Sequence, residues 1–189
     1  IDVGRITDDD FTQALPALEK VRGIVFDMRG YPSRLSPMPL QHLTGSAIES
    51  ARWQIPTITV PDGESDASRF TGERWNLPPL APRLPAKLAF LTDGRAISYA
   101  ESWMGIVEAY RLGAIVGEAT AGTNGNVNPF VLPGGYRVTW TGMRVLKHDG
   151  SRHHGVGILP TIPVTRTIKG VAAGRDESLE RAIVFVESP

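Results

Sequence analysis

Leu88-Ala-Phe-Leu-Thr-Asp-Gly-Arg-Ala-Ile-Ser98 is the stretch of sequence that decides the fold. Its apolar first half predicts a buried strand, and Asp93-Gly94 predicts the turn that ends this strand. A helix is expected from Ser98 to about Leu112, because apolar residues recur at helical spacing and Gly113 is a typical helix stop. A serine at a helix start lies beside unpaired backbone N–H groups, which stabilise negative charge.

Further apolar runs at residues 23–26 and 114–117 predict two more buried strands. A short strand is also expected at residues 1–6. A helix is expected to follow it at Thr7, where three acidic residues suit the helix dipole, and Pro16 is expected to interrupt this helix. The order β-α-β then occurs twice, which predicts a parallel sheet with right-handed crossovers.

The rest of the chain is less regular. Residues 53–60 alternate enough to predict a strand, and residues 61–85 predict a long excursion of functional or packing significance. Residues 130–132, 136–141 and 144–147 predict an added antiparallel β region. A linker is expected at residues 167–170, followed by a closing helix at residues 176–186 that Asp176 caps.

Length and composition exclude several classes of protein. The 189 residues suit a single domain, residues 1–189, and the formal net charge of zero gives no field toward nucleic acid. No run of eighteen apolar residues predicts a membrane span. The absence of cysteine excludes disulfides and thiol nucleophiles. The chain opens without methionine or a signal peptide, which predicts a fragment of a longer chain.

Local spacing leaves the role of Ser98 open. Ser98-Tyr-Ala-Glu101 is a capping-box pattern, in which the serine and glutamate satisfy first-turn amides, and spacing alone favours this interpretation. The alternative is a nucleophile, although the Gly-x-Ser-x-Gly elbow is absent. Gly30 has two interpretations as well: it makes a turn after a buried strand, or its N–H joins that of Tyr99 in an oxyanion hole.

The four histidines do not form a metal motif, because no pair has the His-x-x-x-His spacing. We therefore expect no metal site and no cofactor. His153-His154 could supply the base that a serine nucleophile needs, although adjacent histidines are more often solvated loop residues. Residues 122–126 lack the spacing of a phosphate-binding loop and are better explained as turns.

Four motifs in order resemble the C-terminal-processing and tricorn-like serine peptidases. The first is Gly23-Ile-Val-Phe-Asp-Met-Arg-Gly-Tyr-Pro-Ser33, and the second is Leu91-Thr-Asp-Gly-Arg-Ala-Ile-Ser-Tyr-Ala-Glu101. The third is Val116-Gly-Glu-Ala-Thr-Ala-Gly122, and the tail element is Gly155-Val-Gly-Ile-Leu-Pro160. One such match is weak, but four in sequence over nearly the whole chain are specific.

The resemblance implies an α/β fold with a Clp-protease/crotonase-like core. It also implies that Ser98 is the nucleophile, that the amides of Gly30 and Tyr99 form the oxyanion hole, and that Glu101 orients or caps the segment. The implied partner is a peptide or protein substrate, with no nucleic acid. Peptidases of this kind are usually exported, which implies a periplasmic or extracellular location.

The chain departs from the family pattern at the base. The serine–lysine branch has lysine where this chain has Thr123, so that dyad is excluded by residue type. The tricorn-like branch uses an early histidine, which residues 1–7 lack, and a glutamate at the position of His154. The base is therefore His154, a residue upstream of Ile1, or absent.

Three functions remain at this point. The first is a serine endopeptidase that forms an acyl-enzyme on Ser98 with His154 as base. The second is a domain that keeps the fold and groove, binds peptides or small apolar ligands, and does not turn them over. Acyl-CoA chemistry of the crotonase type shares the fold, but the tail motifs disfavour it.

Overall fold

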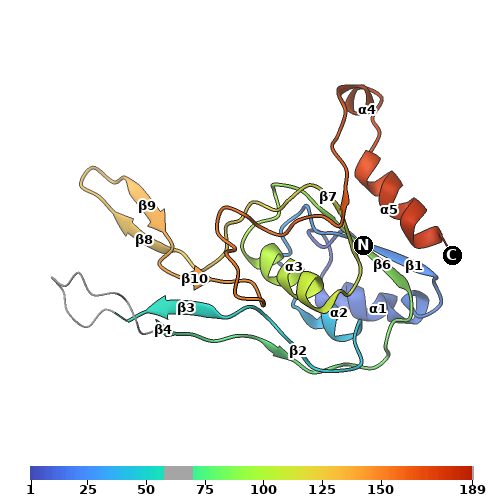
Figure 1. The fold of residues 1–189 in the computed structure, drawn as a ribbon, viewed down its shortest axis with the longest axis horizontal. Coiled ribbons are helices and arrows are strands. Elements are labelled where there is room, and N and C mark those ends of the chain that lie inside the picture. Colours follow the sequence, from blue (N-terminus) through green and yellow to red (C-terminus); the bar gives the residue numbers. More distant parts are fainter. Residues whose placement is uncertain (58–69, 189) are drawn as a thin grey trace.

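The computed structural model describes residues 1–57 and 70–188. Its centre is a four-stranded parallel sheet in the order β1 (Gly23–Asp27), β6 (Lys87–Thr92), β7 (Ala114–Gly117) and β11 (Ile162–Pro163) (Figure 1). The parallel α/β core that the sequence predicts is thus confirmed. The predicted buried strand is β6, and it lies between β1 and β7.

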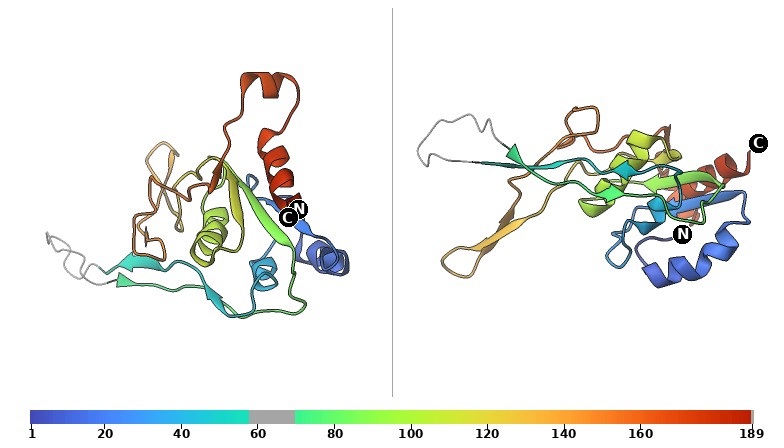
Figure 2. Two further views of the ribbon diagram at one scale, coloured as in Figure 1. Left: turned by 45° about the vertical axis from the view of Figure 1, so that its right-hand side comes forward. Right: turned by 90° about the horizontal axis from the view of Figure 1, so that it is seen from below.

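Both faces of the sheet are covered, which explains why β6 is almost continuously apolar. Leu88 and Phe90 pack into one core, and the alternate residues Ala89 and Leu91 pack into the other. Helix α3 (Tyr99–Tyr110) lies on the Phe90 side, and helix α5 (Glu177–Glu187) lies on the opposite side (Figure 2). Phe90 stacks on the Phe26 ring of the neighbouring strand at a centroid distance of 5.1 Å.

Two expectations for the N-terminal region are wrong. Residues 1–6 form no strand but one parallel bridge, Asp2 to Asp27, beside β1. Helix α1 (Asp8–Leu18) contains Pro16 without interruption. Pro16 lacks the N–H that would donate to the carbonyl of Thr12, four residues earlier, yet the helix continues for two residues beyond it. Its start is as predicted, with Thr7 and Asp10 forming a capping box.

Short antiparallel strands extend from one end of the sheet (Figure 1). The pairs are β2 (Ile48–Glu49) with β5 (Asn76–Leu77), and β8 (Asn128–Val131) with β9 (Arg137–Trp140). Strand β3 (Trp53–Pro56) pairs with both β4 (Phe70–Thr71) and β10 (Arg144–Val145). The predicted antiparallel region is present. The strand predicted at residues 53–60 is β3, but its residues 58–60 lie outside the described residues, as do residues 61–69 of the predicted excursion.

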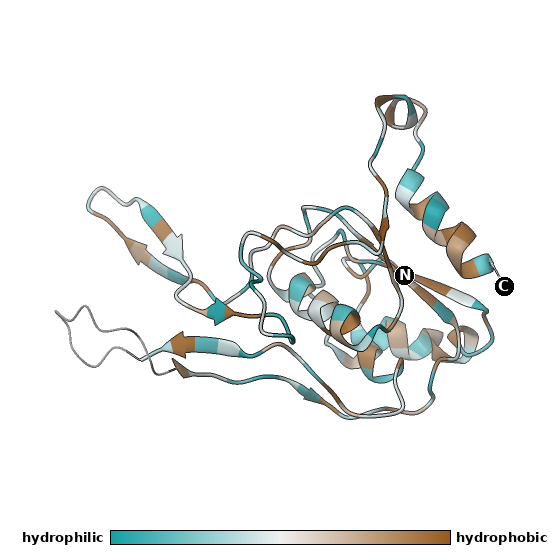
Figure 3. Ribbon diagram, in the orientation of Figure 1, coloured by the Kyte–Doolittle hydropathy of each residue, from teal (hydrophilic) through white to brown (hydrophobic). Residues whose placement is uncertain are grey.

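The β8–β9 hairpin presents one apolar face to solvent. Directly opposed residues share a face, and the pairs Phe130–Val138 and Asn128–Trp140 place mostly apolar side chains together. Phe130 is 45% exposed and Trp140 is 52% exposed. Figure 3 shows hydrophobic residues along β8, away from the two cores.

The C-terminal region adds two helices. The predicted linker is instead helix α4 (Ile168–Ala172), because the Thr167 hydroxyl accepts the Gly170 N–H and so caps a helical turn. Helix α5 begins as predicted, with the Asp176 carboxylate accepting the Leu179 N–H. The short helix α2 (Met38–Gln41) packs Leu40 into the same core as α3.

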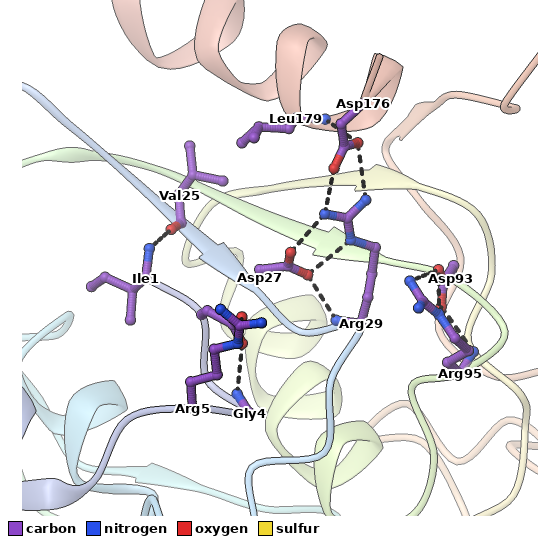
Figure 4. A network of polar contacts seen from close by, with 11 residues as sticks. Ile1, Gly4, Arg5, Val25, Asp27, Arg29, Asp93, Arg95, Asp176 and Leu179 are labelled. Atoms are coloured by element: carbon purple, nitrogen blue, oxygen red, sulfur yellow. Dashed lines mark hydrogen bonds and ion pairs between the residues drawn. The ribbon is translucent and has the colours of Figure 1, made fainter. Parts of the chain in front are cut away.

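A bidentate ion pair ties the end of β1 to the start of α5 (Figure 4). The Arg29 guanidinium donates to Asp27 on one side, with Nη2 to Oδ2 at 2.6 Å, and to Asp176 on the other, with Nη2 to Oδ2 at 2.7 Å. The hydrogen bonds from Arg29 lower the pKa of Asp176. Residues 147 positions apart are thereby held at the carboxyl end of the sheet.

We predict that Phe90→Ala lowers the free energy of unfolding by about 3–5 kcal/mol, because it removes a fully buried ring from the centre of the sheet. Chemical denaturation followed by circular dichroism measures this change. Tyr136→Ala is the control: Tyr136 is 73% exposed, so its removal is expected to change stability by about 0.5 kcal/mol or less. Equal effects of the two substitutions would contradict the core assignment.

Candidate active site

Ser98 lies at the sharp turn between β6 and α3, in an uncommon backbone conformation. It is the N-cap residue of α3 and has φ 50° and ψ −110°. A positive φ is costly for a residue with a side chain and persists only where the surroundings impose it. Here the Ser98 N–H donates to the Thr123 carbonyl at 2.7 Å and is 3.3 Å from Glu101 Oε2. The loop that follows β7 thus holds the serine in place through Thr123.

The Ser98 side chain lines a cleft of about 360 Å³. One wall is polar and contains Ser102 and Asn124, and the Asn124 Nδ2 donates to Ser102 Oγ at 3.1 Å. The remaining lining residues are aromatic or charged: Tyr31, Trp53, Glu73, Arg74, Trp75 and Tyr99, with Asn126 at the start of the β8–β9 hairpin. A serine in such a cleft is accessible to a ligand.

The carboxylate of Glu101 connects Ser98 to the loop that follows β7. Glu101 is 1% exposed, and its Oε1 accepts the Thr120 hydroxyl at 2.6 Å and the Gly122 N–H at 2.7 Å. Its Oε2 accepts the Thr123 N–H at 2.8 Å. The Glu101 half of the predicted capping box is therefore one part of a larger network.

These hydrogen bonds decide the charge of Glu101. Burial raises the pKa of this carboxyl, but His153, Thr120 and the Gly122 N–H together outweigh burial and hold the pKa below its usual value. Glu101 is therefore ionised at neutral pH. An ionised carboxylate accepts from all of its neighbours, so it keeps the loop after β7 in one conformation.

Gly122 allows this loop to approach closely. It has φ +72°, and a Cβ placed on it would lie 2.9 Å from the Gly155 nitrogen. The Gly155 N–H donates to the Gly122 carbonyl, and the Ile158 N–H donates to the Thr120 hydroxyl. The tail element at residues 155–158 is thus attached to the loop that Glu101 organises.

His153, and not its neighbour His154 that the sequence analysis names as the base, is the histidine that contacts Glu101. It is 3% exposed, and its Nε2 lies 3.4 Å from Glu101 Oε1. Two adjacent histidines in a polar loop give no local signal of which one is buried. Only the requirement that a buried Glu101 needs partners could have pointed to this contact.

His154, the predicted base, has a different environment. Its Nε2 accepts the Val145 N–H at 3.2 Å, and it is not among the residues that line the Ser98 cleft. Burial and the neighbouring His153 lower its pKa. A neutral imidazole is the form that can accept a proton, but here its acceptor nitrogen is occupied by Val145. Its role as base stays a prediction.

The two expected oxyanion donors lie on neighbouring segments. Tyr99 is the first residue of α3, and its N–H, like that of Gly30, has no hydrogen-bond partner in the described part of the chain. Gly30 packs against the backbone of Gly4 and lines a second cavity beside Arg29. Tyr31, the next residue, lines the Ser98 cleft. The assignment of these amides remains a prediction.

Within residues 1–57 and 70–188, no group of three or more histidine, aspartate or glutamate side chains is arranged to hold a metal ion. In the same residues, no helix combines the length and apolar character needed to cross a bilayer.

Comparison with known proteins agrees with this architecture. The model of peptidase family S41 matches residues 42–164, which include the cleft serine, Glu101, His153 and His154. A search of curated proteins gave no significant match.

Three solved structures share the fold at low identity. A candidate peptidase from Parabacteroides merdae ATCC 43184 is 18% identical with a TM-score of 0.77, and the match covers 99% of this chain and 59% of that one. The photosystem II D1 C-terminal processing protease (16%, TM-score 0.63) is covered over 45% of its length, against 99% of this chain. The tricorn protease (14%, TM-score 0.63) is covered over 17%, again against 99% of this chain. The chain thus spans less than two thirds of the length of each of them.

We predict that Glu101→Gln lowers the free energy of unfolding at pH 7 by about 2–4 kcal/mol. The reason is that the side-chain NH₂ of glutamine cannot accept a hydrogen bond, so at least one buried donor that now bonds to the carboxylate would lose its partner. The lowered pKa sets the sign of the pH dependence. The Glu101 carboxyl binds its proton more tightly in the unfolded protein than in the folded protein, because its pKa is lowered on folding. The extra stability of the wild type over the variant is therefore present above the pKa of the unfolded state and is lost as pH falls through the pKa of the folded state.

Denaturation of both proteins between pH 7 and pH 3 measures this difference. Glu108→Gln is the matched control on the same helix, where a partly exposed ion pair with Lys147 contributes only about 0–1 kcal/mol. A variant whose stability differs from wild type by the same amount at every pH would contradict the ionised state of Glu101.

Proposed function

Because the chain belongs to peptidase family S41, whose members are serine hydrolases, we propose that it is a serine endopeptidase domain with Ser98 as nucleophile. The observation that carries this proposal is the placement of Ser98. A strained serine at a strand-to-helix turn lines a cleft and is held by the loop that follows the next strand.

The reaction proceeds in two steps. Ser98 Oγ forms a bond to the carbonyl carbon of a peptide, the carbon–nitrogen bond breaks, and the serine proton passes through the base to the leaving amine. Water then attacks the acyl-enzyme, releases a carboxylic acid and restores the serine hydroxyl. The amides of Gly30 and Tyr99 hold the developing oxyanion, a contribution typically worth about 3 kcal/mol per donor.

Glu101 acts in this proposal as a positioning residue. It does not touch the substrate, since it is buried beneath the loop and saturated with hydrogen bonds. Its shared contact with the Ser98 N–H and the Thr123 N–H keeps the serine at the turn. A fixed nucleophile keeps the entropy cost of reaching the transition state low.

His154 is the base in this proposal, and its use requires that Nε2 leaves the Val145 N–H. A specific observation keeps the second function in view: the described residues that line the cleft include no histidine and no lysine. A domain without a base would bind peptides or small apolar ligands in the same cleft and release them unchanged. A peptide substrate and a periplasmic or extracellular location are also part of the proposal. They are properties of whole peptidases, and this chain spans only part of the length of its solved relatives.

We predict that a fluorophosphonate probe labels the wild-type protein on Ser98 and that Ser98→Ala abolishes both the label and peptide cleavage. Mass spectrometry of the labelled protein identifies the site. Ser178→Ala is the control, since Ser178 is a buried serine on α5 far from the cleft in sequence and structure. Cleavage by the Ser98→Ala protein at the wild-type rate would overturn the assignment.

We predict that His154→Gln lowers kcat/KM by roughly 10²–10⁴-fold, the usual contribution of a general base. Wild-type kcat/KM is expected to rise with pH through a value below the ordinary histidine pKa, because the pKa of His154 is lowered and its neutral form is the active one. His148→Gln, at an exposed turn, is the control. An unchanged pH profile in His154→Gln would remove this residue from the mechanism.

A further inference from the structure

The aromatic wall of the Ser98 cleft points to the substrate class. We propose that Trp53, Trp75 and Tyr99 form a binding subsite for a large aromatic or aliphatic side chain on the residue whose carbonyl Ser98 attacks. This inference rests on the proposed function and deepens it. Its experiment includes a measurement that does not depend on catalysis.

The rings form one continuous surface. Trp53 and Trp75 have centroids 5.0 Å apart with their planes at 61°, and Trp75 and Tyr99 have centroids 5.4 Å apart at 74°. Tyr31 continues the row, with its centroid 6.2 Å from that of Tyr99. Edge-to-face contacts are a favoured geometry for aromatic pairs, so the rings stabilise one another's positions. All four residues line the cleft that contains Ser98.

The wall is fixed before a ligand arrives. The Tyr99 hydroxyl donates to the Leu35 carbonyl at 3.0 Å, and the backbone N–H of Trp75 donates to Ser50 Oγ at 2.9 Å. The backbone N–H of Trp53 donates to the Glu73 carbonyl, and Trp53 lies opposite Val145 in the antiparallel pair of β3 and β10. Rigid aromatic side chains lose little conformational entropy on binding, which favours affinity.

The other groups in the cleft disfavour an acidic side chain. The Arg74 guanidinium is paired with Glu49, so its charge is largely compensated. The Glu73 carboxylate has no ion pair or hydrogen bond from its side chain to any described residue. Ser102 and Asn124, which also line the cleft, hydrogen-bond to each other. An apolar ligand therefore meets the rings, whereas an aspartate or glutamate side chain meets the uncompensated charge of Glu73.

The shared position of Ser98 and Tyr99 assigns the subsite to the acyl side of the bond. The Tyr99 N–H is a proposed oxyanion donor, and the Tyr99 side chain belongs to the wall. A carbonyl held between Ser98 and this amide places its own residue nearest to the rings. A cleft of about 360 Å³ leaves a small side chain without contacts on most sides, which forfeits dispersion energy.

The test compares p-nitrophenyl esters of N-acetylated alanine, leucine, phenylalanine and aspartate, which differ only on the acyl side. We expect wild-type kcat/KM for the phenylalanine ester to exceed that for the alanine ester at least about tenfold, with the aspartate ester slowest. Trp53→Ala is expected to lower the phenylalanine-to-alanine ratio about fivefold, and Trp53→Phe is expected to keep most of it.

Trp140→Ala is the matched control, because Trp140 is 52% exposed on the hairpin and does not line the cleft. It is expected to leave the ratio unchanged, and thermal denaturation checks that every variant folds. A wild-type ratio near one, or a ratio that Trp53→Ala does not lower, would overturn the subsite.

Binding separates this inference from the proposed function. The affinity of the Ser98→Ala protein for N-acetyl-phenylalaninamide and N-acetyl-alaninamide, measured by calorimetry, requires no turnover. Preferred binding of the phenylalanine compound that is lost in the Ser98→Ala/Trp53→Ala double variant supports the subsite even if no ester is hydrolysed. Hydrolysis of the esters without such a preference would support the peptidase and reject the subsite.

Discussion

The buried carboxylate of Glu101 is the constraint on which the site depends. A charge removed from water is tolerated only when hydrogen bonds replace its hydration. The donors that replace it come from α3, from the loop after β7 and, through Thr120, from the tail element. The three segments therefore cannot move independently. The positive φ of Ser98 persists because this network, together with the Thr123 carbonyl, fixes the serine N–H.

The sheet could be predicted from sequence because its signal is local. Each residue of β6 from Leu88 to Leu91 is buried on one face or the other, so the strand appears as an uninterrupted apolar run. The partner of β10 could not be predicted in this way. The pair Arg144–Gln54 joins residues 90 positions apart through a strand of two residues, and nothing in either segment specifies the other. Helix α4 was missed because its capping threonine precedes a glycine-containing turn.

The candidate site shows the same division. The sequence presented capping and catalysis as alternatives for Ser98; the structure confirms the capping box with Glu101 and also places Ser98 in the lining of a cleft. The contact between His153 and Glu101 was not predictable, because it depends on how two distant loops meet. What distinguishes the two proposed functions is therefore a proton acceptor rather than the fold.

The ion pairs of Arg29 with Asp27 and Asp176 also have a consequence for biosynthesis. Chains fold from the N-terminus as they leave the ribosome, and Asp27 and Arg29 emerge long before Asp176. Until Asp176 is made, the guanidinium has one carboxylate instead of two, and the segment that carries Gly30 is not yet tied to α5. Strand β11 and the tail element also form late. The central sheet and the ion pairs of Arg29 are therefore completed only once residues 162–176 have been made, so the domain forms its native sheet as a unit.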